Sequence, residues 1–131
     1  AMMEIPEVTL GVFPSFVGTQ RLPRVVGLGY GKEMLATAKK VPAEEALRIG
    51  LVNHVVPAEQ LMEYCEGLAA EICQHSTAAI AYGKMSMNAG LEMDMDRALE
   101  HEATLFGLTF STEDQREGMG AFLEKRSPKF P

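Results

Sequence analysis

Apolar positions follow two different patterns along this sequence, and the change falls near residue 57. Between residues 5 and 56 they come in short runs that glycine and proline interrupt, whereas afterwards they recur three or four residues apart. Short interrupted runs are typical of strands and loops, and the longer spacing is typical of amphipathic helices. We therefore predict an α/β protein that is mainly helical, with mixed structure over residues 1–56 and helices over residues 57–131.

The first part is predicted to contain short strands over residues 5–10 and residues 51–56. Because so few short strands do not form a stable sheet alone, we expect their partners to lie outside this sequence. The segment between residues 11 and 18 is predicted as a loop whose apolar side chains avoid full exposure. The other elements expected here are a helix over residues 19–26 interrupted near Pro23, a flexible joint at Gly27, Gly29 and Gly31, a helix over residues 31–37, and a helix from Pro42 to Gly50.

The second part is predicted to form consecutive helices. The first begins at Pro57 and carries apolar residues from Leu61 to Ile72 at helical spacing. Ser, Asp and Thr side chains accept hydrogen bonds from the first turn of a helix, so each can mark a helix start. On this basis further helices are expected after Ser76, running to about Leu91, after Asp94, and after Thr112, running to about Lys125, with a loose tail over residues 127–131.

Charge and cysteine content restrict the partners and the compartment. The net charge is −6 at pH 7, and a predominantly acidic chain disfavours nucleic acid, because phosphate binding needs basic side chains. No apolar run approaches the ~20 residues of a membrane-spanning helix, so no membrane partner is expected. Cys65 and Cys73 are eight residues apart on one predicted helix, about 12 Å along its axis, which is too far for a disulfide. Reduced thiols and the absence of metal-ligand spacing favour a cytoplasmic protein without a metal.

Several motifs, in this order, resemble the C-terminal part of the enoyl-CoA hydratase/isomerase (crotonase) superfamily. They are Pro6-Glu7-Val8, Leu10-Gly11, Pro14, Gly18-Thr19-Gln20-Arg21-Leu22 with Arg24 and Gly27, AEEALRIGLVNHVV over residues 43–56, TEDQREGM over residues 112–119, and AFLEKR over residues 121–126. The resemblance covers nearly the whole chain. It implies that residues 1–56 form the C-terminal end of a spiral core of stacked ββα turns. Residues 57–131 would then be the helical region that packs trimers.

The resemblance also implies a chemistry. Members act on acyl-CoA thioesters, and hydratases use two glutamates and two backbone N–H groups that stabilise the developing thioester oxyanion. Glu7 matches the second glutamate, which handles the proton at the α-carbon. The first glutamate and the oxyanion hole lie upstream of the matched region, so we expect an enoyl-CoA hydratase-like chain that is inactive alone. No cofactor is implied, because coenzyme A is part of the substrate.

Substrate-binding positions are implied in both parts. Pro14 and Gly18 belong to the loop beside the acyl pocket, where Ser15 and Val17 replace glycines that the family usually has. Because a β-branched residue tolerates left-handed backbone poorly, the loop is expected to differ and the pocket to be smaller. Phe106, Phe122 and Lys125 match positions near the adenine and phosphates of CoA. The alternative, equally supported, is two core phenylalanines and a lysine that stabilises a helix end.

Two alternatives to hydration remain open. A Δ3,Δ2-enoyl-CoA isomerase of this family can work with a single glutamate at the position of Glu7, shuttling a proton between two carbons. A non-catalytic oligomerisation module is the second alternative, because unpaired strand edges and open helix faces favour self-association. In either case a homo-oligomer is expected, either of the trimer type or a swapped dimer.

Overall fold

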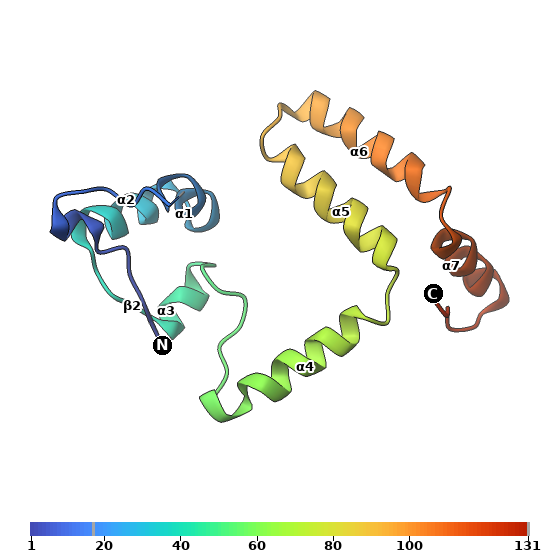
Figure 1. Ribbon diagram of the computed structural model, residues 1–131, viewed down its shortest axis with the longest axis horizontal. Coiled ribbons are helices and arrows are strands. Elements are labelled where there is room, and N and C mark those ends of the chain that lie inside the picture. The colour runs from blue at the N-terminus through green and yellow to red at the C-terminus, as the bar shows by residue number, and fades with distance from the viewer. Residues whose placement is uncertain (17, 131) are drawn as a thin grey trace. The chain divides into compact units, whose positions relative to one another are not determined.

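The computed structural model describes residues 1–16 and 18–130, and the chain divides into two compact units, Ala1–Gln60 and Leu61–Pro131 (Figure 1). The elements of the first unit are β1 (Met2–Met3), the 3₁₀ helix η1 (Glu7–Leu10), α1 (Gly18–Val26), α2 (Leu28–Thr37), β2 (Val41–Pro42), α3 (Ala43–Arg48) and the 3₁₀ helix η2 (Ala58–Gln60). The elements of the second unit are α4 (Leu61–Ile72), α5 (Thr77–Gly90), α6 (Met95–Thr109) and α7 (Glu113–Glu124). The prediction of a mainly helical chain is confirmed.

The first unit is organised around a small apolar core. Met34, Val41 and Ala46 are buried, and they come from α2, β2 and α3 respectively. Strand β1 pairs antiparallel with β2, with Met3 opposite Val41. Partly buried side chains complete this core, namely Met3, Ile5, Leu22, Tyr30, Ile49, Leu51 and Val52.

Helices α1 and α2 pack against each other across a turn at Gly27, whose φ of +82° lies in the left-handed region. Gly31 lies so close to Pro23 that an added Cβ would be 3.2 Å from the Pro23 Cα. Helix α2 starts at Leu28, so Gly29 and Gly31 are inside a helix. The prediction of a flexible joint at all three glycines is therefore wrong beyond Gly27.

Both predicted strands of the first part are wrong. Residues 7–10 form η1 instead, in which Thr9 Oγ1 donates to the Pro6 carbonyl at 2.8 Å and the chain turns at Gly11. In the segment after α3, the N–H groups of Leu51 and Val52 both donate to the Ala46 carbonyl, at 2.8 and 3.3 Å. These residues therefore close the end of α3 and do not form a strand. The helix itself was predicted correctly.

The second unit is built from capped helices. Ser76 accepts a hydrogen bond from the Ala79 N–H at 3.0 Å, and Asp94 and Thr112 begin α6 and α7 in the same way. All three predicted caps are confirmed. Helices α5 and α6 lie side by side as a hairpin, and α7 packs against α5 (Figure 1). Ser76 Oγ also donates to Asp114 Oδ2 at 2.5 Å, which ties the start of α5 to α7.

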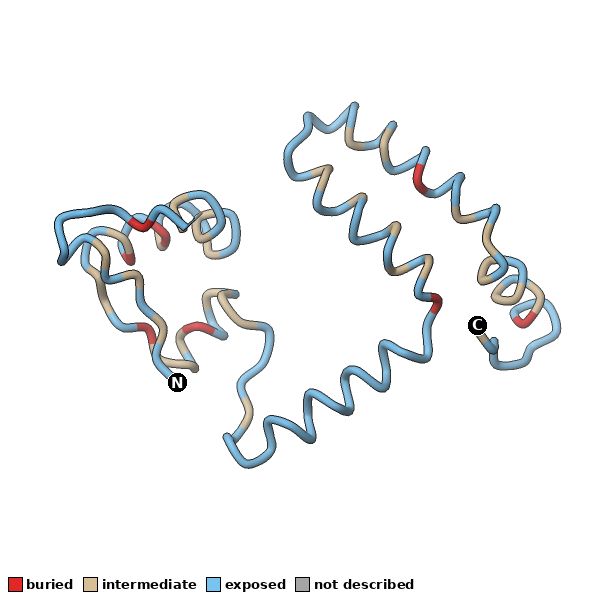
Figure 2. The backbone as a smooth tube through the Cα atoms, viewed as in Figure 1, coloured by how far each residue is buried: buried red, intermediate tan, exposed pale blue. Residues whose placement is uncertain are grey.

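Burial within the second unit is sparse. Leu105 of α6 and Ala121 of α7 are its buried apolar residues among those described. All twelve residues of α4 are exposed, and Figure 2 shows that helix as an uninterrupted exposed stretch. An amphipathic helix gains most of its stability by burying its apolar face, so α4 presents a face without a partner within its unit.

Residues 126–130 are not loose, contrary to the prediction for the tail. Arg126 donates from Nη1 and Nη2 to the Glu117 carboxylate at 2.6 and 2.9 Å. The backbone N–H of Lys129 donates to the same carboxylate at 2.6 Å. The tail is therefore fastened to the side of α7.

Candidate active site

Glu7 begins η1, and its side chain lines a hollow of about 630 Å³ with Gly11, Val12, Phe13, Ser15 and Phe16. Its Oε2 atom is buried, and no hydrogen-bond donor within the described residues reaches it. A buried carboxylate oxygen without a donor is unfavourable, and such atoms are usually satisfied by a proton, water or ligand. Glu7 therefore combines a buried carboxylate oxygen that has no donor among the described residues with a position on the wall of the hollow.

The backbone around Glu7 fixes where its side chain points. The Glu7 carbonyl accepts the Val12 N–H at 3.3 Å, and Gly11 adopts a left-handed φ of +76° at the end of η1. A residue with a side chain is disfavoured in that conformation, so Gly11 lets the chain turn and bring residues 12–16 beside Glu7.

Pro14 and Gly18 contact each other rather than the hollow. Pro14 is buried, and a Cβ added at Gly18 would be 3.1 Å from the Pro14 Cβ. Neither residue lines the hollow that contains Glu7. Their contact places the loop relative to the start of α1, which gives them a supporting position.

The apolar residues of the predicted loop after η1 differ from the sequence prediction in their exposure. Phe16 lines the hollow and its side chain is 101% exposed, and Val12 and Phe13 are exposed as well. The expectation that the apolar residues of this loop avoid full exposure is therefore wrong for Phe16, whereas Val12 and Phe13 are 59% and 64% exposed. The predicted effect of Val17 lies outside the described residues. The aromatic wall at Phe13 and Phe16 was missed as a site feature, although their proximity to Glu7 in the sequence was a signal for it.

A second hollow, of about 560 Å³, lies among α5, α6, α7 and the tail. Its apolar wall includes Tyr82, Met87, Leu105, Phe106 and Phe130. Phe106 is 64% exposed and packs edge-to-face on Phe110, with ring centroids 5.3 Å apart. Of the three residues predicted to contact CoA, Phe106 is thus the one that lines a hollow.

Phe122 lies on α7 and Lys125 directly follows that helix. Phe122 is 78% exposed, so the interpretation of Phe106 and Phe122 as core residues is wrong. Lys125 follows the last residue of α7 with a left-handed φ of +54°, and its N–H donates to the Phe122 carbonyl at 3.2 Å. Its cationic side chain is placed where the helix dipole favours it, which agrees with the structural interpretation. Exposure leaves both side chains accessible to a ligand or a partner chain.

Glu117 is the titratable group whose environment departs most from that of a free carboxylate. The hydrogen bonds from Arg126 and from the Lys129 N–H lower the pKa of Glu117 from 4.5 to about 2. In turn, the carboxylates of Glu117 and Glu124 raise the pKa of Arg126 above its ordinary value. These groups form an ion pair at neutral pH, not a proton-transfer site.

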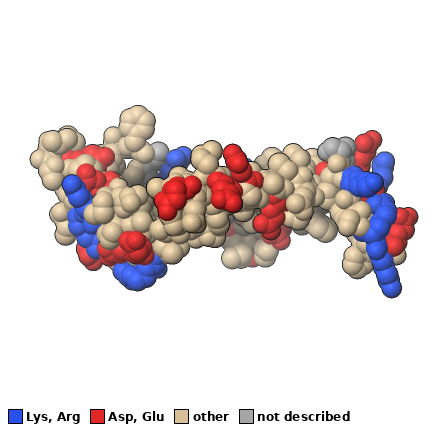
Figure 3. Space-filling view, turned by 90° about the horizontal axis from the view of Figure 1, so that it is seen from below, with Lys and Arg blue, Asp and Glu red and all other residues tan. Residues whose placement is uncertain are grey.

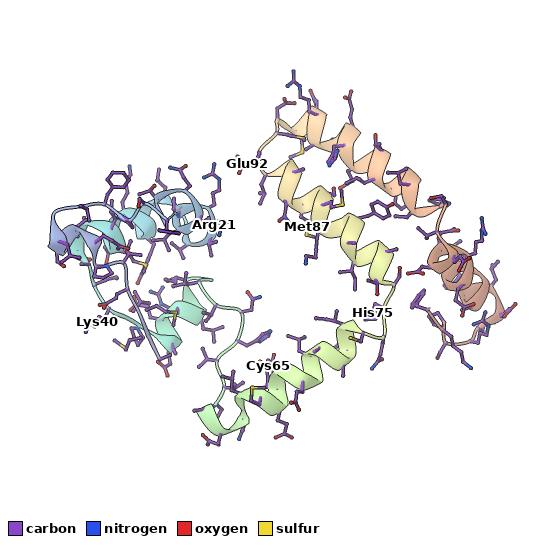
Figure 4. All side chains as sticks on the ribbon, viewed as in Figure 1. Arg21, Lys40, Cys65, His75, Met87 and Glu92 are labelled. Carbon is purple, nitrogen blue, oxygen red and sulfur yellow. The ribbon has the colours of Figure 1, made fainter. Side chains whose placement is uncertain are left out.

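The remaining chemistry of the described residues is unremarkable. Cys65, which Figure 4 labels on α4, and Cys73, just beyond that helix, are exposed free thiols. No group of three or more His, Cys, Asp and Glu side chains there could hold a metal ion. On the face drawn in Figure 3, basic side chains gather in groups that have acidic side chains beside them. None of the helices in the described part is long and apolar enough to cross a membrane.

Comparisons with known proteins identify the family. The family model described as enoyl-CoA hydratase/isomerase matches residues 1–131. The chain belongs to the enoyl-CoA hydratase/isomerase family. It is 50% identical over 125 residues to the crotonyl-CoA hydratase of Syntrophomonas wolfei, covering 95% of this chain and 48% of that protein. It is 44% identical over 117 residues to a short-chain-enoyl-CoA hydratase of Clostridioides difficile, covering 89% of this chain and 76% of that protein.

Solved structures agree with this assignment. The crystal structure of an enoyl-CoA hydratase from Bacillus anthracis superposes with a TM-score of 0.95 at 35% identity, covering 99% of this chain and 50% of that one. The chain thus has the fold of part of an enoyl-CoA hydratase. It spans about half the length of the first curated relatives that it matches.

Proposed function

We propose that this chain supplies one catalytic carboxylate, Glu7, to an enoyl-CoA hydratase that adds water to 2-enoyl-CoA thioesters. The observation that carries the proposal is the Oε2 atom of Glu7, buried beside a hollow and without a donor from the described residues. Family membership and the names of the most similar hydratases support it.

In this proposal Glu7 handles the proton at the α-carbon. Water gives its hydroxyl to the β-carbon and its proton to a second glutamate, while a proton from the Glu7 carboxyl goes to the α-carbon. The thioester oxygen gains negative charge as the hydroxyl adds, so it needs two backbone N–H donors. Both the second glutamate and these donors are assigned, by resemblance, to the part of the relatives that this chain does not match.

Phe106, Phe122 and Lys125 are proposed contacts of coenzyme A. An exposed aromatic ring can stack on adenine, and an ammonium group can pair with phosphate. The exposure of Phe122 and the position of Lys125 at the end of α7 support this assignment. Pro14 and Gly18 are proposed to shape the acyl end of the site through the loop that carries Phe16. No further cofactor takes part, and a cytoplasmic location is proposed for such an enzyme.

Isomerisation of 3-enoyl-CoA is the second candidate from the same residue. It requires Glu7 alone to remove a proton from one carbon and return it to another, and the free Oε2 atom suits that step. The two activities differ in their products, because isomerisation adds no water and keeps the double bond.

A hybrid protein tests both candidates. This chain would replace the 125-residue stretch that it matches in the crotonyl-CoA hydratase of Syntrophomonas wolfei. We expect the hybrid to hydrate crotonyl-CoA, observed as loss of the enoyl-thioester absorbance, while the isolated chain shows no turnover. A hybrid that converts 3-enoyl-CoA to 2-enoyl-CoA but adds water to neither compound would favour isomerisation as the activity. A folded hybrid with neither activity would contradict the proposal.

We also propose that the second unit mediates oligomerisation, in a homo-oligomer of the trimer or swapped type. The exposed helix α4 supports this, together with exposed apolar side chains on α7 such as Phe122 and Leu123. Apolar surface on this scale is typical of protein that is covered by another surface. In an isolated chain, where the second glutamate and the oxyanion hole are absent, oligomerisation through this surface would be the main role.

A further inference from the structure

The chain reverses direction at the end of α7. Lys125 adopts a left-handed conformation, and the next N–H, that of Arg126, donates to the Ala121 carbonyl at 3.0 Å. This pattern ends helices efficiently and sends the following residues back along the helix. Residues 126–130, called the strap below, therefore run beside α7 and not away from it.

Glu117 fastens the strap at two points. The guanidinium of Arg126 forms a fork on the carboxylate, with Nη1 and Nη2 at 2.6 and 2.9 Å, and three residues later the Lys129 N–H donates to Oε1 at 2.6 Å. Charge-assisted and forked hydrogen bonds are stronger than neutral ones. Glu124 also contacts Arg126, through Nε at 2.6 Å, but no such bond joins it to the strap backbone among the described contacts.

The fastened strap places Phe130 against the second hollow. The Phe130 ring lies over Gly118, where an added Cβ would be 3.6 Å from Cε1 and 3.7 Å from Cζ. Gly118 has no side chain, so the ring reaches the surface of α7 itself. Phe130 is half-buried, and it forms one wall of the 560 Å³ hollow that Leu105 and Phe106 also line.

We propose that Glu117 is a latch that holds the strap closed over this hollow, and that its release opens the hollow from the Phe130 side. The hollow falls within the size range of small-molecule pockets, and its walls are mainly apolar. Phe130 forms the wall of the hollow on the side of the strap. Opening the strap therefore removes the contact between Phe130 and Gly118 and lets an apolar ligand enter the hollow. This proposal does not depend on the reaction proposed for Glu7.

Hydrogen exchange at the Lys129 amide measures the latch directly. Glu117→Gln removes the charge that holds both donors, so exchange at this amide should accelerate about tenfold or more. Glu124→Gln is the matched control, because it removes a contact to the same arginine but leaves the Lys129 bond in place. Exchange within about twofold of the original protein is expected for the control.

The opening of the hollow needs a second readout. In Glu117→Gln, a soluble gadolinium chelate should broaden the methyl signals of buried Leu105, while those of Met34 in the other unit stay sharp. Arg126→Ala lies beyond α7 and should give the same pattern if the first variant perturbs the helix. Lys129 exchange that is unchanged in both variants, or Leu105 signals as sharp as in the original protein, would overturn the proposal.

Discussion

Glu7 and Glu117 are both partly buried glutamates, but their surroundings differ in kind. The carboxylate of Glu117 accepts hydrogen bonds from two side-chain nitrogens of Arg126 and from one backbone N–H, and its pKa is lowered to about 2. The Oε2 atom of Glu7 is buried and receives no donor from the described residues, and Glu7 lines a hollow. A fully satisfied carboxylate holds structure together, whereas an unsatisfied one is available to react.

The pKa of Glu117 gives a prediction for pH. Because the folded pKa lies below the ordinary value of 4.5, the ion pair stabilises the fold above pH 4.5. That contribution should be lost as the pH falls from 4.5 towards 2. Carboxyl ¹³C chemical shifts of Glu117 measured between pH 2 and 7 test this. An ordinary titration midpoint for Glu117 would contradict the latch, and added salt should weaken it, since the pair is partly exposed.

Among the helices, substitutions at two glycines of α2 are predicted to change the stability of the chain in opposite directions. Gly29 has nothing within 4 Å of an added Cβ, so Gly29→Ala should stabilise the chain by up to about 1 kcal/mol through helix propensity. Gly31→Ala would place its Cβ 3.2 Å from Pro23 atoms whose ring and backbone cannot move aside easily. It should therefore destabilise the chain, by about 1–3 kcal/mol. Urea unfolding of the two variants tests this, and equal stabilities would contradict the close packing of α1 on α2.

The helix caps of the second unit make another paired prediction. Ser76→Ala removes both the cap of α5 and the hydrogen bond to Asp114, while Asp94→Ala removes a cap in an exposed place. Loss of a cap costs about 1 kcal/mol, and Ser76→Ala should cost more, because it also leaves a half-buried carboxylate without its donor. If urea unfolding gives equal losses for the two variants, the bond between Ser76 and Asp114 contributes nothing to stability.

The sequence predicted these helices better than it predicted strands. Ser76, Asp94 and Thr112 mark helix starts through a local interaction, which a short stretch of sequence contains in full. The alternation at residues 5–10 favoured a strand, but a strand needs a partner, and local bonds such as that from Thr9 to Pro6 formed η1 instead. Likewise, the N–H groups of Leu51 and Val52 donate to the carbonyl of Ala46, so these residues do not form a strand.

The candidate site was predictable only in part, for the same reason. Glu7 was proposed because its neighbours form a family motif. The hollow beside it, the contact of Pro14 with Gly18 and the latch at Glu117 depend on chain reversals at Gly11 and Lys125, which no single motif encodes. Phe106 lines the second hollow and Phe122 does not, and this difference depends on how the helices pack, which the sequence does not show.

At the scale of the whole molecule, exposed apolar surface is the main feature to explain. Large apolar side chains remain exposed on helices of the second unit, among them Leu61, Met62, Phe122 and Leu123. Burial of such surface drives association at about 25 cal/mol per Å². We predict that the isolated chain self-associates at micromolar concentration, as measured by light scattering. A clean monomer under those conditions would contradict the oligomerisation role.

In the proposed mechanism, Glu7 donates and removes the proton at the α-carbon of an enoyl-CoA. The most direct test of this role is kcat for crotonyl-CoA hydration by the hybrid with the Syntrophomonas wolfei hydratase, compared with the same hybrid carrying Glu7→Gln. Gln is nearly the same size but cannot exchange a proton, so kcat should fall by about 10²–10⁴-fold while the fold is retained. A Glu7→Gln hybrid that hydrates crotonyl-CoA at the unmodified rate would show that the proton at the α-carbon is handled elsewhere.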